Sequence, residues 1–312
     1  ATAGGRLRKL QAEAVLGLRR TGLVGLLVMG PKVSGELYDS EELDTLRTIA
    51  REAAAALENI DFFQAAARDR EMRKELEDAS DIQAKLFPTH VPRLTSGELA
   101  GCCFPARSTG GDYYDFLKLP SRKVGLAMSD VAGRGMPASL LMASVESLLR
   151  TQASTVESLA ELIQKLNQQL QAVAREKKLC TLFYGVYDDA TRRLDYVNAG
   201  HSPPLLLTAA GVQFLDSTGL PLGLFPESVH QPRSLILAPG TMMLIYSDGV
   251  VDARNGRGDS FGPDRLASAL SRELESHAER ALARVVTDIR DFEGGTLLED
   301  DQTLVLLKIH SE

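Results

Sequence analysis

Four short acidic segments in the last two-thirds of the sequence place an aspartate beside a turn or at the end of an apolar run. They are Gly110-Gly111-Asp112, Ser129-Asp130-Val131-Ala132-Gly133, Ser247-Asp248-Gly249 and Glu299-Asp300-Asp301. A short carboxylate next to glycine stands where the backbone turns and can approach a ligand closely. Carboxylates without histidine or cysteine partners suit magnesium or manganese, whereas zinc prefers imidazole or thiolate. Two such ions about 3.5–4 Å apart are a common arrangement for hydrolysing phosphate esters.

Each aspartate taken alone has a simpler explanation. Aspartate is common in turns because its side chain hydrogen-bonds to nearby backbone groups. A site is favoured because the pattern recurs at the strand ends of one predicted sandwich. Asp130 follows a strand-like run, and the glycine-spaced turn after it exposes backbone carbonyls, among which that of Val131 is the candidate extra ligand for a hard cation. Asp248 repeats this arrangement after the run "MMLIYS".

The overall composition excludes several classes of protein. A chain of 312 residues predicts two domains, or one large domain with an appendage. The formal net charge of −7 argues against nucleic acid as a main partner. No apolar run reaches the roughly 20 residues that span a bilayer, and the start lacks the apolar core of a signal peptide. We therefore expect a cytoplasmic protein without a membrane or nucleic-acid partner, and we interpret Cys102, Cys103 and Cys180 as buried free thiols.

The first 62 residues read as a helix at 6–20, a strand at 22–30, a loop, and a helix at 41–59 with Ser40 as its N-cap. These elements are too few to form a core alone. The segment "GLLVMGPKVSGELYDSEELDTLRTIAREAAAALENI" resembles the closing third of a GAF sensor domain. The resemblance covers only that end, so we interpret residues 1–62 as the C-terminal part of a GAF-like domain.

A helix then continues from 61 to 86 without a breaker. Apolar positions step by threes and fours through Met72, Leu76, Ala79, Ile82 or Gln83, and Leu86, which is coiled-coil spacing. The alternative is a solvated helix that packs one stripe on its own catalytic domain, and the sequence leaves both open. The prolines of Phe87-Pro88-Thr89-His90-Val91-Pro92 end the helix. We expect a helical linker over 63–92 and a separate domain over 93–312.

The remainder predicts an α+β domain. Strands are expected at 99–106, 112–119, 124–131, 181–188, 193–199, 204–208, 212–215, 241–247 and 303–309, and helices at 137–151, 156–175, 263–274 and 279–292. The segments 120–123 and 188–191 are typical of hairpin loops between antiparallel neighbours. Strands joined by hairpins, with helices in adjacent pairs, predict an antiparallel β-sandwich flanked by pairs of helices.

Seven ordered segments carry a family resemblance: "ARSTGGDYYDF", "SDVAGRGMPASLLMA", "TLFYGVYD", "VNAGHSPPLLL", "GLPLGLF", "LIYSDGVVDARN" and "DDQTLVLL". Together with "DIQAKLFP" before them, they resemble the SpoIIE-type branch of the metal-dependent PPM (protein phosphatase 2C-like) serine/threonine phosphatases. The resemblance implies two manganese or magnesium ions at one edge of the sandwich. Carried over by motif, Asp130 and the Val131 carbonyl contact both ions, Asp112 holds the second, and Asp248 with either Asp300 or Asp301 holds the first.

Two further residues are candidates for contact with substrate. Arg107 could grip phosphate through its guanidinium, or it could be an ordinary surface arginine. His201 could protonate the leaving oxygen, or it could organise its loop through a ring hydrogen bond, which we favour. Asp112, Asp130 and Asp248 are the predicted catalytic residues.

The sequence therefore predicts a metal-dependent phosphatase acting on phosphoserine or phosphothreonine. The resemblance implies a STAS-domain anti-anti-sigma factor as the substrate, with regulation by the N-terminal sensor through the helical linker. We expect a homodimer through that linker helix. The alternative is a non-catalytic, phosphatase-like binding or scaffold module in a signalling pathway.

Overall fold

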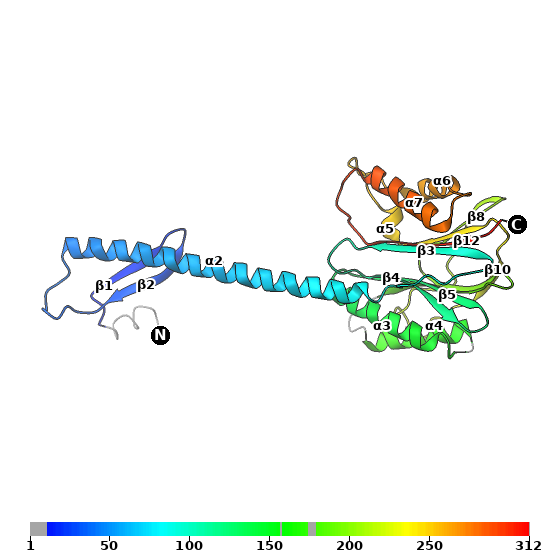
Figure 1. Ribbon diagram of the computed structural model, residues 1–312. Helices are drawn as coiled ribbons and strands as arrows, with labels where there is room; N and C mark the ends of the chain where they lie inside the picture. Colours follow the sequence, from blue (N-terminus) through cyan, green and yellow to red (C-terminus); the bar gives the residue numbers. More distant parts are fainter. Residues whose placement is uncertain (1–10, 157, 174–178, 312) are drawn as a thin grey trace. The chain divides into compact units, whose positions relative to one another are not determined.

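The structure is a computed structural model that describes residues 11–156, 158–173 and 179–311. The chain divides into two compact units, Ala1–Glu75 and Leu76–Glu312. Figure 1 shows that the second unit holds the large sandwich of strands and helices, with the helix α2 leading into it. Among the helices of the described part, none combines the length and the apolar composition needed to cross a membrane.

The first unit is a β-hairpin packed on the beginning of a long helix. Strand β1 (Ala14–Arg19) pairs antiparallel with β2 (Leu23–Met29). The predicted helix at 6–20 is therefore wrong over 14–19, while residues 6–10 lie outside the described residues. Side-chain exposure alternates along β1, and the segment pairs with β2, so it forms a strand. The charged residues of the segment obscured this alternation in the sequence. Leu18 packs there with Ala50 and Ala54 of the helix.

Helix α2 (Ser40–Ala84) is continuous over 45 residues, which confirms the predicted helix at 41–59 and, as far as Ala84, the predicted helix at 61–86. Its N-cap is Asp39 rather than the predicted Ser40. The Glu42 N–H donates to Asp39 Oδ1 at 2.9 Å, and the Asp39 N–H donates to Glu42 Oε2 at 2.8 Å. This reciprocal capping box satisfies two backbone donors at once, which a serine one residue later cannot do.

The end of α2 belongs to the second unit. Leu86 lies beyond the helix and packs against the core of the sandwich. Of the two alternatives that the sequence left open for the stripe, Leu86 follows the second, because its side chain packs on its own domain. By contrast, the Met72 side chain is 61% exposed. The predicted stripe therefore divides between an exposed part and a part packed on the sandwich of the second unit.

The second unit contains two five-stranded antiparallel sheets. One has the order β10-β7-β6-β5-β4, and the other has the order β3-β12-β11-β8-β9. The strands are β3 (Gly97–Phe104), β4 (Asp112–Leu119), β5 (Lys123–Val131), β6 (Cys180–Asp188), β7 (Arg193–Ala199), β8 (Leu205–Thr208), β9 (Gly211–Phe214), β10 (Arg233–Ile236), β11 (Met242–Tyr246) and β12 (Gln302–Ile309). The predicted hairpins at 120–123 and 188–191 join β4 to β5 and β6 to β7, as expected.

Helices cover both outer faces of the sandwich, as Figure 1 shows. They are α3 (Met136–Gln152), α4 (Leu159–Val173), α5 (Asp248–Val251), α6 (Gly262–Ser271) and α7 (Ala278–Glu293). The predicted helix at 156–175 extends into residues 174–175, outside the described part. Strand β10 and helix α5 were not predicted. The predicted α+β class, an antiparallel sandwich flanked by pairs of helices, is confirmed, while the GAF-like nature of the first unit stays a prediction.

Alternation along the strands builds three apolar layers. On β5, Leu126 and Met128 point between the two sheets. Ala127 and Val131 point to the opposite face and pack with α3 and α4. A third cluster joins β11 and β12 to helices α5, α6 and α7. Because the layers fix both sheets, the loops at their ends are held in defined positions.

The hairpin between β6 and β7 carries a buried carboxylate that fastens the start of the domain. Asp189 is 7% exposed and accepts hydrogen bonds from the backbone N–H groups of Thr95 at 3.0 Å and Ser96 at 2.8 Å. Their hydroxyls and the Arg122 guanidinium, at 3.1 Å, add further contacts. Burial alone raises the pKa of Asp189, but these hydrogen bonds outweigh it and hold the pKa below its ordinary value.

Asp189→Asn is expected to lower the free energy of unfolding at pH 7 by about 2–3 kcal/mol, since it weakens hydrogen bonds to a buried charge. The folded pKa is depressed, so this contribution is present above the unfolded pKa of about 3.9 and is lost as pH falls towards the folded value. The difference in the free energy of unfolding between wild type and variant should therefore become smaller below about pH 4. Denaturant unfolding followed by circular dichroism measures it, because the chain has no tryptophan. Asp216→Asn, at an exposed position, is the control. Equal stability of Asp189→Asn and wild type at pH 7 would contradict this account.

Candidate metal centre

Both sheets deliver carboxylates to one edge of the sandwich. Asp112 opens β4 and is the direct cross-strand partner of Asp130 near the end of β5. Asp248 opens α5 immediately after β11, and Asp300 and Asp301 immediately precede β12, which pairs with β11. The Thr303 hydroxyl of β12 donates to Asp112 Oδ2 at 2.6 Å, so the two sheets are linked at this edge. The structure thus brings the predicted acidic residues together.

The electrostatics of the cluster reflect this crowding. Burial, followed by repulsion from Asp248, Asp300 and Asp301, raises the pKa of Asp130 to about 7. Burial and then the charge of Asp130 raise the pKa of Asp112. Burial and then Asp300 raise the pKa of Asp248. All three carboxylates are destabilised as anions, so positive charge at this edge would be favourable.

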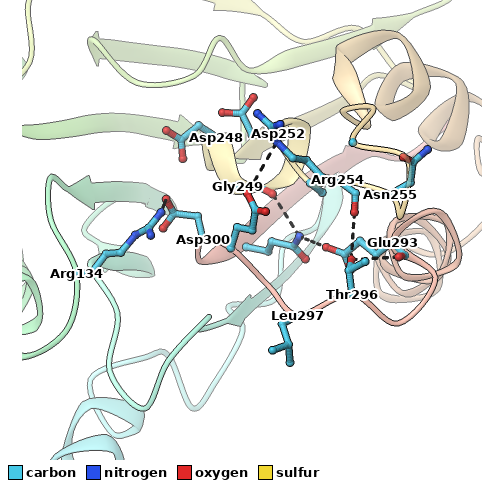
Figure 2. Close-up of a pocket in the computed structure, with 14 residues that line it drawn as sticks. Arg134, Asp248, Gly249, Asp252, Arg254, Asn255, Glu293, Thr296, Leu297 and Asp300 are labelled. Carbon is cyan, nitrogen blue, oxygen red and sulfur yellow. Dashed lines mark hydrogen bonds and ion pairs between the residues drawn. The ribbon is translucent and has the colours of Figure 1, made fainter.

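Asp300 and Asp301 have different surroundings although they are adjacent. Asp301 Oδ1 accepts the Ala106 N–H at 2.8 Å, and its Oδ2 accepts the Gly111 N–H at 2.8 Å. The Asp300 side chain is 48% exposed and lies 3.1 Å from the Arg134 guanidinium. Asp300 also lines the same pocket as Asp248 (Figure 2). Asp301 therefore holds the backbone of the site, and Asp300 faces its opening.

Two glycines are required by close packing in the turn before β4. A Cβ on Gly110 would lie 2.1 Å from Asp301 Oδ2, and one on Gly111 would lie 2.6 Å from the Val131 carbonyl oxygen. A side chain at Gly110 would displace the Asp301 carboxylate, and one at Gly111 would require the backbone to shift. The Gly110-Gly111 turn is thereby pressed against both Asp301 and the carbonyl that was predicted as a ligand.

The donor set can be compared with what a metal needs. Within residues 11–156, 158–173 and 179–311, no three histidine, cysteine, aspartate or glutamate side chains converge tightly enough, as they stand, to enclose an ion. The neighbouring groups are nevertheless all oxygen donors that repel one another. Mutually repelling carboxylates at a partly open edge fit hard divalent cations, since a cation supplies the missing counter-charge.

A pocket of ≈ 420 Å³ opens beside two of these carboxylates, Asp248 and Asp300. Figure 2 shows Asp248, Asp300 and Arg134 on one side of it, with Arg254 and Asn255 on the other. The walls are mostly polar and charged, which suits a polar chain segment better than an apolar small molecule.

His201 lies behind the site rather than in the pocket. Its side chain is 4% exposed, and its Nδ1 is 2.8 Å from the Thr181 hydroxyl. Burial lowers the pKa of His201 to about 4, so the ring is neutral near pH 7. Thr181 is the cross-strand partner of Asp130. A buried, neutral His201 that contacts Thr181 is better placed to organise its loop than to donate a proton to the substrate.

Arg107 lies exposed in the connection between β3 and β4 and does not line the pocket of Figure 2. The arginine that does face the acidic cluster is Arg134, which the sequence analysis did not select. Its position between two glycines of the acidic turn was the available signal.

Gln83 of α2 is a second contact that the sequence analysis missed. Its Nε2 donates to the Gly110 carbonyl at 2.8 Å, and its Oε1 accepts the Gly110 N–H at 3.1 Å. The buried amide therefore ties the last turn of α2 to the turn that presents Asp112. A polar residue at one position of an apolar stripe was the sole sequence signal.

Comparisons with known proteins agree with this geometry. The family model described as Stage II sporulation protein E (SpoIIE) matches residues 120–310. IcfG of Synechocystis sp. is 29% identical over 266 residues, covering 76% of this chain and 42% of that protein. The phosphoserine phosphatase RsbU of Bacillus subtilis is 27% identical over 244 residues, covering 77% of this chain and 71% of RsbU. The chain thus spans less than half the length of IcfG.

Solved structures share the fold. The RsbU and RsbW domains of Rv1364c from Mycobacterium tuberculosis align with a TM-score of 0.60 and 26% identity, covering 72% of this chain and 63% of that one. The SiaA-PP2C domain of Pseudomonas aeruginosa aligns with a TM-score of 0.67 and 20% identity, covering 78% of this chain and 99% of that one. The resemblance inferred from the seven segments is confirmed. The SpoIIE family model matches more than half of the residues of this chain, and the chain therefore belongs to the SpoIIE family.

Proposed function

We propose that this chain is a metal-dependent protein phosphatase that hydrolyses phosphoserine or phosphothreonine. One observation carries the proposal: Asp112, Asp130, Asp248 and Asp300 arrive from both sheets at a single partly open edge. The kinship with RsbU, a phosphoserine phosphatase, supports it. A non-catalytic module is disfavoured because all the expected carboxylates are in place.

We assign the ligands from the surroundings of each group. Asp130, with the Val131 carbonyl, stands at the centre, Asp112 lies on one side, and Asp248 with Asp300 on the other. We assign Asp300 rather than Asp301, because both oxygens of Asp301 accept backbone N–H groups and Asp300 lines the pocket beside Asp248. Two manganese or magnesium ions, when bound, would supply the activated water and the Lewis acidity that phosphate-ester hydrolysis needs near neutral pH.

The chain's own groups then have defined tasks. Thr303 orients Asp112 by its hydrogen bond. Asp301 and Gln83 hold the Gly110-Gly111 turn from two sides. A thiol nucleophile is not expected, since burial raises the pKa of Cys102 to about 12 and that of Cys103 as well. Asp130 and its neighbours are therefore the groups on which the reaction depends.

We infer that the substrate is a folded, phosphorylated STAS-domain anti-anti-sigma factor. The support is the kinship with RsbU and the solved protein that joins RsbU and RsbW domains in one chain. A phosphorylated STAS-domain protein should be turned over at least tenfold faster, in kcat/KM, than a phosphoserine peptide of the same local sequence. Equal rates for the two would contradict recognition of a folded domain and leave a general phosphatase.

We further propose that the N-terminal sensor acts through α2, and that the chain is a homodimer through this helix. The two hydrogen bonds between the Gln83 side-chain amide and the backbone of Gly110 connect α2 directly to the turn that carries Asp112. Exposed apolar side chains of the predicted stripe, Met72 at 61% and Ile82 at 63%, offer a surface for a second copy.

Met72→Glu is therefore expected to weaken dimerisation at least tenfold and to change the phosphatase rate. A buried charge at a helix–helix seam is strongly unfavourable. Sedimentation velocity over a range of protein concentrations measures the effect. The control is Lys74→Glu, a charge reversal at an exposed position two residues further along α2. An unchanged association state with wild-type rates in Met72→Glu would leave the helix as a passive tether.

A further inference from the structure

Arg134 lies in the turn between β5 and α3, on the edge that presents the acidic cluster. The flanking Gly133 and Gly135 have φ angles of 117° and 70°, which L side chains rarely adopt. A Cβ at either glycine would meet nothing within 4 Å, so the turn stands clear of neighbouring atoms. This open turn lets the arginine side chain extend towards the pocket.

The guanidinium of Arg134 is paired with a carboxylate that we assign as a metal ligand. Its Nη2 lies 3.1 Å from Asp300 Oδ2, across 166 residues of sequence. Figure 2 shows the two side chains meeting at the mouth of the pocket, near Asp248. Both are about half exposed, at 53% and 48%. An ion pair so open to water is weak and easily exchanged.

The other arginine of the pocket has a different partner. Arg254 Nε lies 3.8 Å from Glu299, a carboxylate outside the proposed ligand set. Among the described residues that line this pocket, Arg134 and Arg254 are the two cationic side chains. A cation that binds Asp300 would therefore compete with Arg134, and not with Arg254, for this carboxylate.

We propose that Arg134 is a displaceable counter-ion of Asp300 that, once released, binds the phosphoryl group of the substrate. A divalent cation shared by several carboxylates outcompetes a single exposed guanidinium for Asp300. The released guanidinium remains at the mouth of the pocket, and its planar array of donors matches phosphate oxygens bidentately. One residue thus offsets the charge of Asp300 before the cation binds and positions the substrate afterwards.

The first half of the proposal concerns metal binding alone and is independent of the phosphatase activity. In calorimetric titrations of metal-free protein with Mn²⁺, without substrate, Arg134→Gln is expected to bind about two- to fivefold more tightly than wild type, because the competitor is gone. Arg134→Lys should lie between the two. The matched control is Arg254→Gln, which removes the same charge from the same pocket without freeing Asp300. It measures how much general loss of positive charge contributes, and we expect less than a twofold change.

The second half rests on the proposed function. With Mn²⁺ saturating, Arg134→Gln should raise the KM for a phosphoserine peptide, and the inhibition constant of inorganic phosphate, by about tenfold or more, with kcat changed much less. Arg134→Lys should recover part of this loss, because the charge remains but the paired donors do not.

The outcomes separate cleanly. Arg134→Gln binding Mn²⁺ no more tightly than Arg254→Gln would overturn the counter-ion role. An unchanged inhibition constant for phosphate in Arg134→Gln would overturn the phosphoryl role. If the wild type binds Mn²⁺ but hydrolyses no phosphoserine substrate, the proposed function fails, while the metal titrations still decide the role of Arg134 towards Asp300.

Discussion

Replacing Asp130 with asparagine is expected to lower turnover about a thousandfold while the protein stays folded. Asp130 is the one side-chain carboxylate that we assign to both ions, and an amide supplies one neutral acceptor in its place. Because burial and then Asp248, Asp300 and Asp301 raise its pKa to about 7, its charge opposes folding in the metal-free protein. The variant should therefore be as stable as wild type, or more stable, in EDTA at pH 8.

The stability of the metal-free protein should depend on pH through the ionisation of Asp130. A folded pKa above the unfolded value of about 3.9 means that the stability contributed by the protonated group is complete below that value and is lost as pH rises through about 7. Metal-free wild type should lose stability across this range, and Asp130→Asn should lose less. A folded Asp130→Asn that keeps wild-type turnover would return this residue to the class of ordinary turn formers.

Asp300→Asn and Asp301→Asn are expected to differ although the residues are adjacent. Asp301→Asn should lower the free energy of unfolding by about 2–4 kcal/mol. In wild type each carboxylate oxygen of Asp301 accepts a backbone N–H, from Ala106 and from Gly111. In the variant one of these oxygens becomes an NH₂ group, so one backbone N–H faces another donor and loses its acceptor. Its turnover should fall as well, because Asp301 holds the Gly110-Gly111 turn. Asp300→Asn should leave stability nearly unchanged and weaken Mn²⁺ binding.

Thermal unfolding in EDTA and calorimetric Mn²⁺ titration of the two variants separate these effects. The exposed Asp216→Asn is again the control for a neutralised carboxylate. The assignment would be reversed if Asp300→Asn lost stability while Asp301→Asn lost only metal affinity.

Much of the sandwich could be predicted because local signals agree with the fold. Strands at 112–119 and 193–199 were predicted with the bounds that the structure gives β4 and β7. Their alternation and flanking turns are complete within the segment itself. The strand β1 was missed because its pairing with β2, rather than its own residues, decides its conformation. β10 is a largely exposed edge strand of four residues that pairs with β7, and its sequence carries almost no apolar pattern.

The site could be predicted as a set of residues but not as a network. Aspartates that recur in turns and beside strand-like runs identified the acidic cluster, yet nothing local distinguishes Asp300 from Asp301. The distinction comes from the Ala106 N–H, 195 residues earlier in the chain. The contacts of Gln83 and Arg134 could not be predicted for the same reason, because their partners are distant in sequence and are brought near only by packing.

The central claim is that this chain hydrolyses phosphoserine with bound divalent cations held by oxygen ligands. The direct measurement is phosphate release from a phosphorylated STAS-domain protein by metal-stripped enzyme, in EDTA and after addition of Mn²⁺ or Mg²⁺. The account predicts no turnover above background in EDTA and restoration by either ion. Full turnover by the metal-stripped protein in chelator would contradict it.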